Sequence, residues 1–193
     1  MGTFAATILA ATALAAPVPQ APCESRPVGK PWHGHLVCGF QLPEQTDYLV
    51  TWDNALQTPF NRPWRRWGTD KLVVTTETIA AEYHVRFGGR LVIGDLSRPR
   101  GGRFGRRYGG EGHASHQNGL DVDIYYPRRD RAELPPFKPA EVDRARAQWL
   151  VDRAALDAQV AFIGPHVRLR RPSRNVRYLS HHDNHLHLRI DWP

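Results

Sequence analysis

Five of the ten histidines lie in two short segments, residues 112–123 and 182–187. They are His113, His116, His182, His185 and His187. Neutral imidazole is among the commonest protein ligands of transition metals, and carboxylates often complete the ligand set. Metal binding is therefore the simplest explanation for such crowding.

Apolar and polar side chains alternate through residues 120–125 and again through residues 185–190. A period of two indicates a half-buried strand, which places Asp123 on the polar face of the first strand and His187 on that of the second. A glycine just before the first strand permits a turn, so His116 can fold back beside Asp123. If the strands are neighbours, these three side chains converge.

Two imidazoles and one carboxylate fill three positions of a tetrahedral Zn²⁺ ion and leave the fourth for water. An open position is typical of a catalytic zinc, which lowers the pKa of its water to about 7. His185 is placed to act as general base, and His182 to donate a hydrogen bond to a developing oxyanion. Either segment alone is weak support for a metal site, but the two together favour it.

Residues 112–124 resemble the metal-binding signature of the penicillin-insensitive murein endopeptidases. The spacing His182-x-x-His185-x-His187 resembles the second signature of that family. The resemblance is close over about residues 91–127 and 176–191 and weak elsewhere. The wider group includes D-Ala-D-Ala metallopeptidases, lysostaphin-type endopeptidases and hedgehog-like domains. Asp121 favours the murein endopeptidases, because the dipeptidases of the group usually carry a small residue there.

The resemblance implies a small sheet around zinc and hydrolysis of peptide cross-links of the D-alanyl-diaminopimelate type in peptidoglycan. It implies three zinc ligands, namely His116, Asp123 and His187. It also implies catalytic roles for His185 and His182, and His113 matches a further histidine near the metal. Two alternatives stay open: a D-Ala-D-Ala carboxypeptidase, or a non-catalytic, zinc-stabilised module that binds the cell wall.

The length of 193 residues and a hydrophobic content of 41% fit one globular domain with a substantial core. The formal net charge of +7 suits a polyanionic partner. Peptidoglycan, with its peptide carboxylates, qualifies. Nucleic acid qualifies by charge alone, but it would leave the histidines unexplained and is not expected as a partner.

Residues 4–16 are almost wholly apolar, about the length of the core of a signal peptide. No basic residue precedes them, which departs from the usual signal-peptide pattern. We predict a signal peptide over residues 1–16, no membrane span elsewhere, and a periplasmic or secreted protein. An oxidising compartment permits a disulfide between Cys23 and Cys38.

The remaining chain predicts an α+β domain with a small, mostly antiparallel central sheet and two main helices. Residues 17–47 are proline-rich and are interpreted as an irregular arm before a metallopeptidase domain at 48–193. One helix is expected after the cap Thr69-Asp70, and a second from Pro139. Buried strands are expected near residues 91–95 and 160–164.

Residues 98–112 are dense in glycine and arginine and have no apolar periodicity. We interpret them as a mobile loop beside the site. Arg103, Arg106 and Arg107 can hold substrate carboxylates by bidentate hydrogen bonds. The alternative is an ordinary solvated basic loop.

Overall fold

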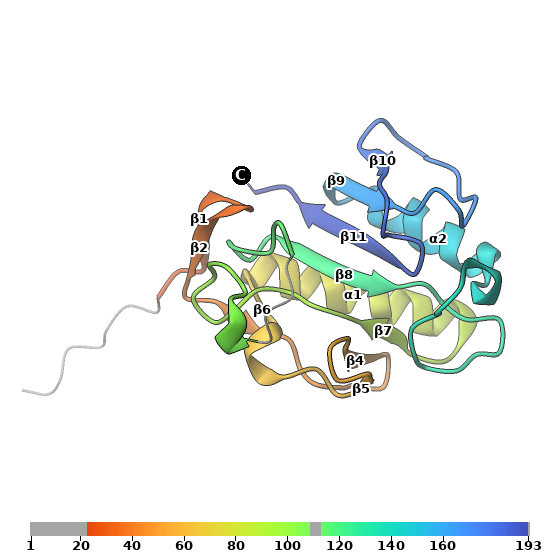
Figure 1. Cartoon of the computed structure of the whole chain (residues 1–193), viewed down its shortest axis with the longest axis horizontal. Coiled ribbons are helices and arrows are strands. Elements are labelled where there is room, and N and C mark those ends of the chain that lie inside the picture. Colours follow the sequence, from red (N-terminus) through yellow and green to blue (C-terminus); the bar gives the residue numbers. More distant parts are fainter. Residues whose placement is uncertain (1–22, 109–112, 193) are drawn as a thin grey trace, which may run out of the picture.

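The computed structural model describes residues 23–108 and 113–192 (Figure 1). The apolar segment 4–16, interpreted above as a signal peptide, lies outside the described residues. Within the part of the chain that is described, no helix is long and apolar enough to cross a membrane.

The strands and helices follow one another along the chain as follows. The strands are β1 (Arg26–Lys30), β2 (His33–Val37), β3 (Phe40–Gln41), β4 (Leu49–Asp53), β5 (Thr58–Pro59), β6 (Trp67–Gly68), β7 (Leu91–Ile93), β8 (Asp121–Tyr125), β9 (Ala158–Ile163), β10 (Val176–Tyr178) and β11 (His185–Ile190). The helices are α1 (Asp70–Phe87) and α2 (Arg144–Ala154), with short 3-10 turns at Pro63–Arg65, Arg106–Tyr108 and Pro139–Glu141.

The main sheet has seven strands in the order β10-β9-β11-β8-β7-β4-β5. Only the β10–β9 and β7–β4 pairs are parallel, and the other four pairs are antiparallel. The pairs β1–β2 and β3–β6 form separate two-stranded sheets. The predicted α+β class, with a mostly antiparallel sheet and two main helices, is confirmed.

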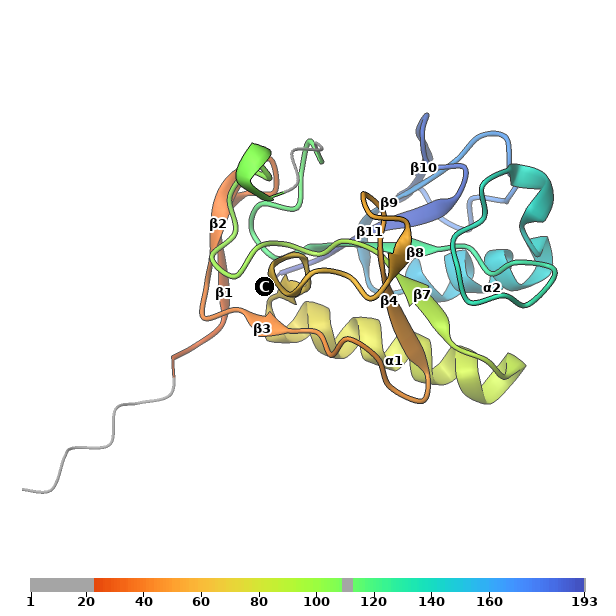
Figure 2. The same cartoon turned by 60° about the horizontal axis from the view of Figure 1, so that its bottom comes forward.

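Both helices cover the same face of the main sheet. They lie behind it in Figure 1 and beneath it in the turned view of Figure 2. The core between helices and sheet contains Val122 and Ile124 of β8 and Leu186, Leu188 and Ile190 of β11. Because side chains alternate along a strand, the polar residues of β8 and β11 project to the other face.

Helix α1 begins where the sequence predicts. The Thr69 side chain accepts a hydrogen bond from the backbone N–H of Leu72, and Gly88 ends the helix with a positive φ of 69°. The predicted start of the second helix at Pro139 is wrong. Pro139 opens a 3-10 turn, and α2 begins at Arg144 because the Asp143 carboxylate accepts hydrogen bonds from the next turn and caps it.

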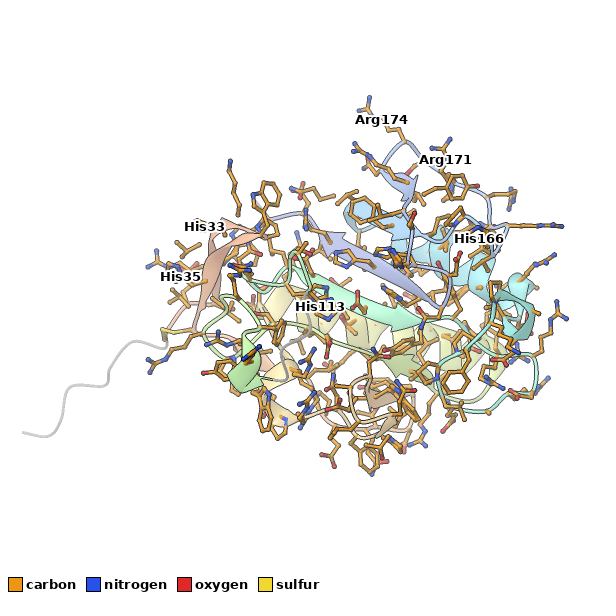
Figure 3. The ribbon with its side chains drawn as sticks, viewed as in Figure 1. His33, His35, His113, His166, Arg171 and Arg174 are labelled. Atoms are coloured by element: carbon orange, nitrogen blue, oxygen red, sulfur yellow. A yellow bond between two sulfur atoms is a disulfide. The ribbon has the colours of Figure 1, made fainter. Side chains whose placement is uncertain are left out.

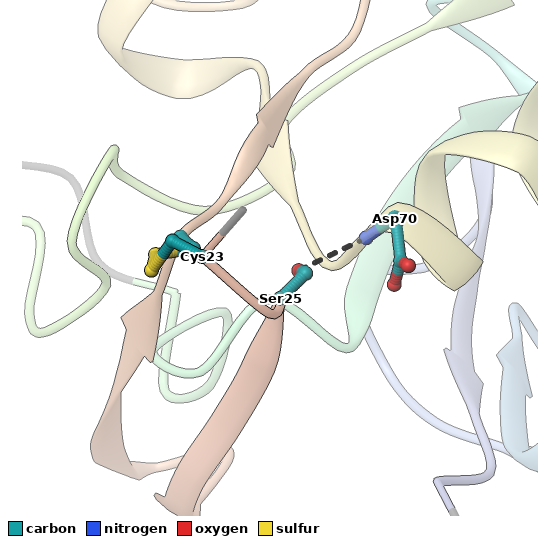
Figure 4. Close-up of a disulfide and its surroundings, with 4 residues drawn as sticks. Cys23, Ser25 and Asp70 are labelled. Carbon is teal, nitrogen blue, oxygen red and sulfur yellow. Dashed lines mark hydrogen bonds between the residues drawn. A yellow bond between two sulfur atoms is a disulfide. The ribbon is translucent and has the colours of Figure 1, made fainter. Parts of the chain in front are cut away.

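The prediction of an irregular N-terminal arm is wrong for residues 26–37, which form the antiparallel hairpin β1–β2. Most of its side chains are exposed or half-buried, so the sequence lacks the apolar alternation that marks a strand. Cys23 and Cys38 are joined by a disulfide across the base of the hairpin (Figure 4). Nearby, Ser25 Oγ accepts a hydrogen bond from the backbone N–H of Asp70, which attaches the segment to α1.

Candidate metal centre and active-site cleft

Strands β8 and β11 lie side by side and bring the two histidine segments together. The pair is antiparallel, and His187 is directly opposite Asp123. Both residues project from the face that the helices leave free. The prediction that β8 is half-buried is wrong, since all five of its residues are buried. Asp123 and His187 are only 4% and 6% exposed, so the centre lies in a poorly solvated environment.

His116 reaches the same face from the loop before β8. Its φ of 66° lies in the left-handed region, which is uncommon for residues other than glycine. The backbone N–H of His116 donates to Oδ2 of Asp121 at 3.0 Å. Gly119 is also left-handed, and a Cβ there would lie 2.8 Å from a methyl carbon of Leu36. The expected turn through this glycine is confirmed, and Asp121 stabilises it.

The three expected ligands converge on one buried point. Nε2 of His116 lies 3.2 Å from Nδ1 of His187 and 3.4 Å from Oδ1 of Asp123. Nδ1 of His187 lies 3.0 Å from the same carboxylate oxygen. His113 approaches from the loop, with Nδ1 3.5 Å from Oδ2 of Asp123. One ligand atom from each of His113, His116 and Asp123 lies within 4.8 Å of the others, a spacing that can hold a metal ion.

In His113, His116 and His187 the ring nitrogen farther from Asp123 forms a hydrogen bond to an oxygen. Nε2 of His113 contacts Oδ2 of Asp95 at 2.7 Å. Nδ1 of His116 contacts the carbonyl oxygen of Leu96 at 3.0 Å, and Nε2 of His187 contacts Oδ1 of Asp121 at 3.0 Å. Such oxygens accept hydrogen bonds, so the farther nitrogens carry the hydrogens. Metal-ligating histidines are usually oriented in this way.

The nitrogens that face Asp123 are consequently lone-pair donors when the rings are neutral. Two imidazole nitrogens and a carboxylate then point at one another, an arrangement that requires a cation among them. A donor set of nitrogen and oxygen atoms suits Zn²⁺ among other divalent metals. The residues present therefore fit a metal ion, and His113 fits as a fourth donor.

In the metal-free centre a proton takes the place of the required cation, and the pKa shifts show which residue carries it. Burial alone raises the pKa of Asp123, but the neighbouring histidines, above all His116, hold it well below the usual value. Burial lowers the pKa of His116. Burial also opposes charge on His187, but hydrogen bonds to Asp121 and Asp123 outweigh it and raise its pKa to about 9. Without metal, Asp123 is thus a carboxylate and His187 an imidazolium near pH 7.

The centre opens into a cleft of about 790 Å³. His113, His182, His185 and His187 line it, together with apolar side chains of Trp32, Phe162 and Leu179. Trp32 belongs to the turn of the β1–β2 hairpin and is 54% exposed. A substrate therefore has access to the histidines between the hairpin and the segment that follows β10.

The structure places both expected catalytic histidines beside the metal centre. Nε2 of His185 lies 3.7 Å from Oδ1 of Asp123, while its Nδ1 contacts the side-chain oxygen of Asn184 at 2.7 Å. The ring of His182 lies 4.7 Å from that of His185, centroid to centroid. Burial lowers the pKa of His185 to about 4 and that of His182 as well, so both rings are neutral near pH 7.

The sequence analysis missed the buried pair that holds His113. Nε of Arg65 donates to Oδ1 of Asp95 at 2.7 Å, and both side chains are about 5% exposed. Asn61 donates to the same Asp95 oxygen at 2.9 Å. Asp95 lies two residues after the buried strand β7, and an acidic residue so close to a buried segment was the available signal. Nothing in the sequence indicated that Arg65 would be its partner.

The remaining predicted site residues are the three arginines of the loop rich in glycine and arginine. Arg103 and Arg106 are exposed, and the role of Arg103, Arg106 and Arg107 in holding substrate carboxylates stays a prediction. His33 and His35 are exposed on β2 of the hairpin and lie apart from His113 (Figure 3).

A sheet backed by two helices, with a buried His–Asp centre in an open cleft, defines a protein with a candidate metal centre accessible to substrate. The family model described as penicillin-insensitive murein endopeptidase matches residues 27–171, more than half of the chain, so the chain belongs to that family. The match includes His113, His116 and Asp123, whereas the histidines of residues 182–187 lie beyond it. The resemblance expected from the sequence is confirmed.

Two relatives illustrate the similarity. The penicillin-insensitive murein endopeptidase of Pectobacterium atrosepticum is 31% identical over 156 residues, which are 67% of this chain and 54% of the relative. That of Salmonella arizonae is 28% identical over 204 residues, which are 92% of this chain and 69% of the relative. The chain thus spans little more than half the length of the first relative.

Proposed function

We propose that this chain is a zinc-dependent murein endopeptidase that hydrolyses peptide cross-links of the D-alanyl-diaminopimelate type in peptidoglycan. The observation that carries the proposal is the convergence of His116, Asp123 and His187 in a cleft that also contains two neutral histidines. Family membership supports the substrate, since the relatives are named as murein endopeptidases.

His116, Asp123 and His187 would hold the zinc ion, with His113 as a further donor. When bound, zinc polarises the scissile carbonyl and makes a water molecule acidic enough to be a nucleophile near neutral pH. The remaining steps are assigned to side chains of this chain. Asp121, Leu96 and Asp95 orient the three histidines through their farther nitrogens.

His185 is the proposed general base. Its Nδ1–H is donated to Asn184, so Nε2 carries the lone pair and faces the centre. A pKa of about 4 keeps the ring neutral and able to accept a proton at pH 7. As water attacks the carbonyl carbon, its proton passes to Nε2 of His185. When the C–N bond breaks, the same proton passes to the leaving amine.

His182 is assigned to stabilise the oxyanion, and the geometry sets a condition on that role. Its Nδ1 lies 2.9 Å from the carbonyl oxygen of Ser180. The single N–H of the neutral ring is therefore donated to that oxygen. Only the protonated ring has a second N–H to donate. His182 would therefore perform this role as an imidazolium whose proton comes from solvent, because the proton on His185 is the one that passes to the leaving amine.

Digestion of purified cross-linked peptidoglycan, with and without a chelator, tests the proposal. Conversion of cross-linked dimers into monomers, abolished by chelator and restored by Zn²⁺, is the expected result. Release of terminal D-alanine alone would instead identify a D-Ala-D-Ala carboxypeptidase. Binding to the polymer without any product would identify a cell-wall binding module.

We further propose a periplasmic or secreted location, because cross-linked peptidoglycan and an oxidising environment for Cys23–Cys38 are both found outside the cytoplasm. Thiol counting on the native protein under denaturing conditions should find no free thiol. Two free thiols in a cytoplasmic fraction would contradict the proposed location.

A further inference from the structure

Five exposed arginines lie on the segment that joins β9 to β10 and on β10 itself. They are Arg168, Arg170, Arg171, Arg174 and Arg177, and together they are called the basic ridge. No aspartate or glutamate occurs between Asp157 and Asp183. In Figure 3 the side chains of Arg171 and Arg174 project outward beside β10, away from the body of the protein.

The charges of the basic ridge are largely uncompensated. Of its five residues only Arg170 forms an ion pair with a described residue, and that contact, to Asp152, is 3.8 Å long with Arg170 80% exposed. Arg171 lies over the ring of Tyr178, 5.0 Å from its centroid. Arginines elsewhere in the described structure more often pair at close range, as Arg90 does with Glu133 at 2.5 Å. The ridge is therefore a patch of available positive charge.

The backbone that carries these arginines is firmly attached to the domain. Val167, Leu169 and Val176 are buried in the core. The Tyr178 hydroxyl donates to the carbonyl oxygen of Leu169 at 2.7 Å, and the side-chain oxygen of Gln148 accepts from the backbone N–H of Arg170 at 2.7 Å. Binding of a ligand to the ridge would therefore cost little backbone conformational entropy, because the backbone is already ordered.

The ridge is continuous with the cleft. Arg177 precedes Leu179 by two residues, at most about 7 Å of extended chain, and Leu179 lines the cleft together with His182. β10 is the outermost strand of the main sheet, so its far side is open. A polymer bound along the ridge can therefore extend into the cleft that the histidines line.

We propose that the basic ridge binds peptide carboxylates of peptidoglycan on the stems that flank the cross-link being cut. This inference rests on the proposed function, and it names a second contact with the same substrate. Guanidinium groups bind carboxylates bidentately, and several such contacts along one polymer reinforce one another. The polymer that enters the cleft is the ligand of the ridge, because the two surfaces adjoin.

The test compares two variants that lose the same charge. The ridge variant carries Arg168→Gln, Arg171→Gln, Arg174→Gln and Arg177→Gln. The matched control carries glutamine at four exposed arginines elsewhere, Arg26, Arg86, Arg131 and Arg144. Binding to insoluble peptidoglycan is measured by co-sedimentation at several salt concentrations. Turnover is measured on the polymer and on a small, soluble cross-linked muropeptide.

The ridge variant should bind the polymer about tenfold or more weakly, with a shallower salt dependence, while the control binds like the native chain. Turnover of the small muropeptide should be unchanged in both. Both variants should bind equally weakly to peptidoglycan whose carboxyl groups have been converted to amides. Equal losses in ridge and control variants, or native binding to the amidated polymer, would overturn the proposal.

The outcomes also separate this inference from the proposed function. If the native chain cleaves neither substrate while the ridge variant alone loses polymer binding, the endopeptidase assignment fails and the ridge stands. If cleavage is normal and the ridge variant binds as the native chain does, the ridge fails alone. A ridge that binds a phosphate-bearing polymer but not peptidoglycan would identify a different partner and contradict the proposal.

Discussion

Nε2 of His116 and Nδ1 of His187 lie 3.2 Å apart, although both rings use their other nitrogen to contact an oxygen. Two neutral rings held in this way would present lone pairs to each other in a buried environment. The contact is favourable only when a proton or a metal ion lies between them and Asp123. This relationship allows the centre to bind a metal ion, and it makes the affinity for that ion depend on pH.

The first prediction is that His116→Ala, Asp123→Ala and His187→Ala each lose bound zinc. Each substitution removes one of the three proposed zinc ligands, and with it a donor atom that faces the ion. Elemental analysis of the purified variants gives the occupancy. His35→Ala, which removes an exposed histidine of the hairpin, is the control and should keep the native zinc content. Full occupancy in all three ligand variants would contradict the assignment.

The second prediction concerns competition between zinc and protons. In the metal-free protein His187 has a raised pKa of about 9, whereas His116 is neutral and Asp123 is already ionised. Below about pH 9 zinc must displace the proton of His187, so the apparent affinity should rise about tenfold per pH unit toward pH 9 and then level off. Calorimetry at pH 7 in two buffers should report at least about one proton released, the one that His187 gives up. Binding without proton release at pH 7 would contradict this account.

The third prediction separates catalysis from metal binding. His185→Ala should retain zinc, because its nearer nitrogen lies 3.7 Å from Asp123 and is not among the converging donors. Loss of a general base typically reduces turnover about 10²–10⁴-fold. Zinc content and kcat are measured on the same preparation. Near-native kcat with zinc bound would mean that another group accepts the proton.

The fourth prediction concerns the Asp95 carboxylate, which is buried between Arg65 and His113. Asp95→Asn leaves the Arg65 charge without its partner, and breaking a buried pair typically costs about 3–5 kcal/mol of unfolding free energy. Loss of the oxygen that orients His113 should also weaken zinc binding, by about 10–100-fold if His113 is a ligand. Urea unfolding and competition with a chromophoric chelator measure the two effects.

A matched control for Asp95→Asn is Asp130→Asn. Asp130 pairs with Arg128 at 2.6 Å, but its side chain is 53% exposed. Exposed ion pairs contribute little to stability, so this variant should be nearly as stable as the native chain. Zinc affinity unchanged in Asp95→Asn, with stability reduced, would mean that His113 is not oriented by Asp95 or is not a ligand.

The parts of the fold that were predictable are those that local pattern determines. Alternation identified β8 and β11, and capping residues identified the start of α1. The spacing from His116 to Asp123 indicated the turn, because the glycine between them permits a positive φ. Convergence with His187 required only that the two strands be neighbours, which they are.

The parts that were not predictable depend on contacts between distant segments. The β1–β2 hairpin has little apolar alternation, and its position depends on backbone hydrogen bonds such as Leu36 N–H to the Arg100 carbonyl oxygen at 3.0 Å. The Arg65–Asp95 pair joins residues thirty positions apart. Neither charge periodicity nor spacing specifies such a pairing, so the support of His113 emerges only from the structure.

The last prediction concerns the disulfide that closes the N-terminal hairpin. Cys23 and Cys38 are 15 residues apart, and a loop of this size is expected to contribute about 3 kcal/mol by restricting the unfolded chain. The double variant Cys23→Ser, Cys38→Ser should lose about that much unfolding free energy in urea. Among the described residues, no hydrogen bond or ion pair joins either cysteine to the metal centre, so zinc affinity should stay native. The KM for cross-linked peptidoglycan should rise, because the loosened hairpin carries Trp32 in the cleft wall. Native KM in the double variant would show that the hairpin holds Trp32 without the bridge, and reduced zinc affinity would show that the hairpin also supports the centre.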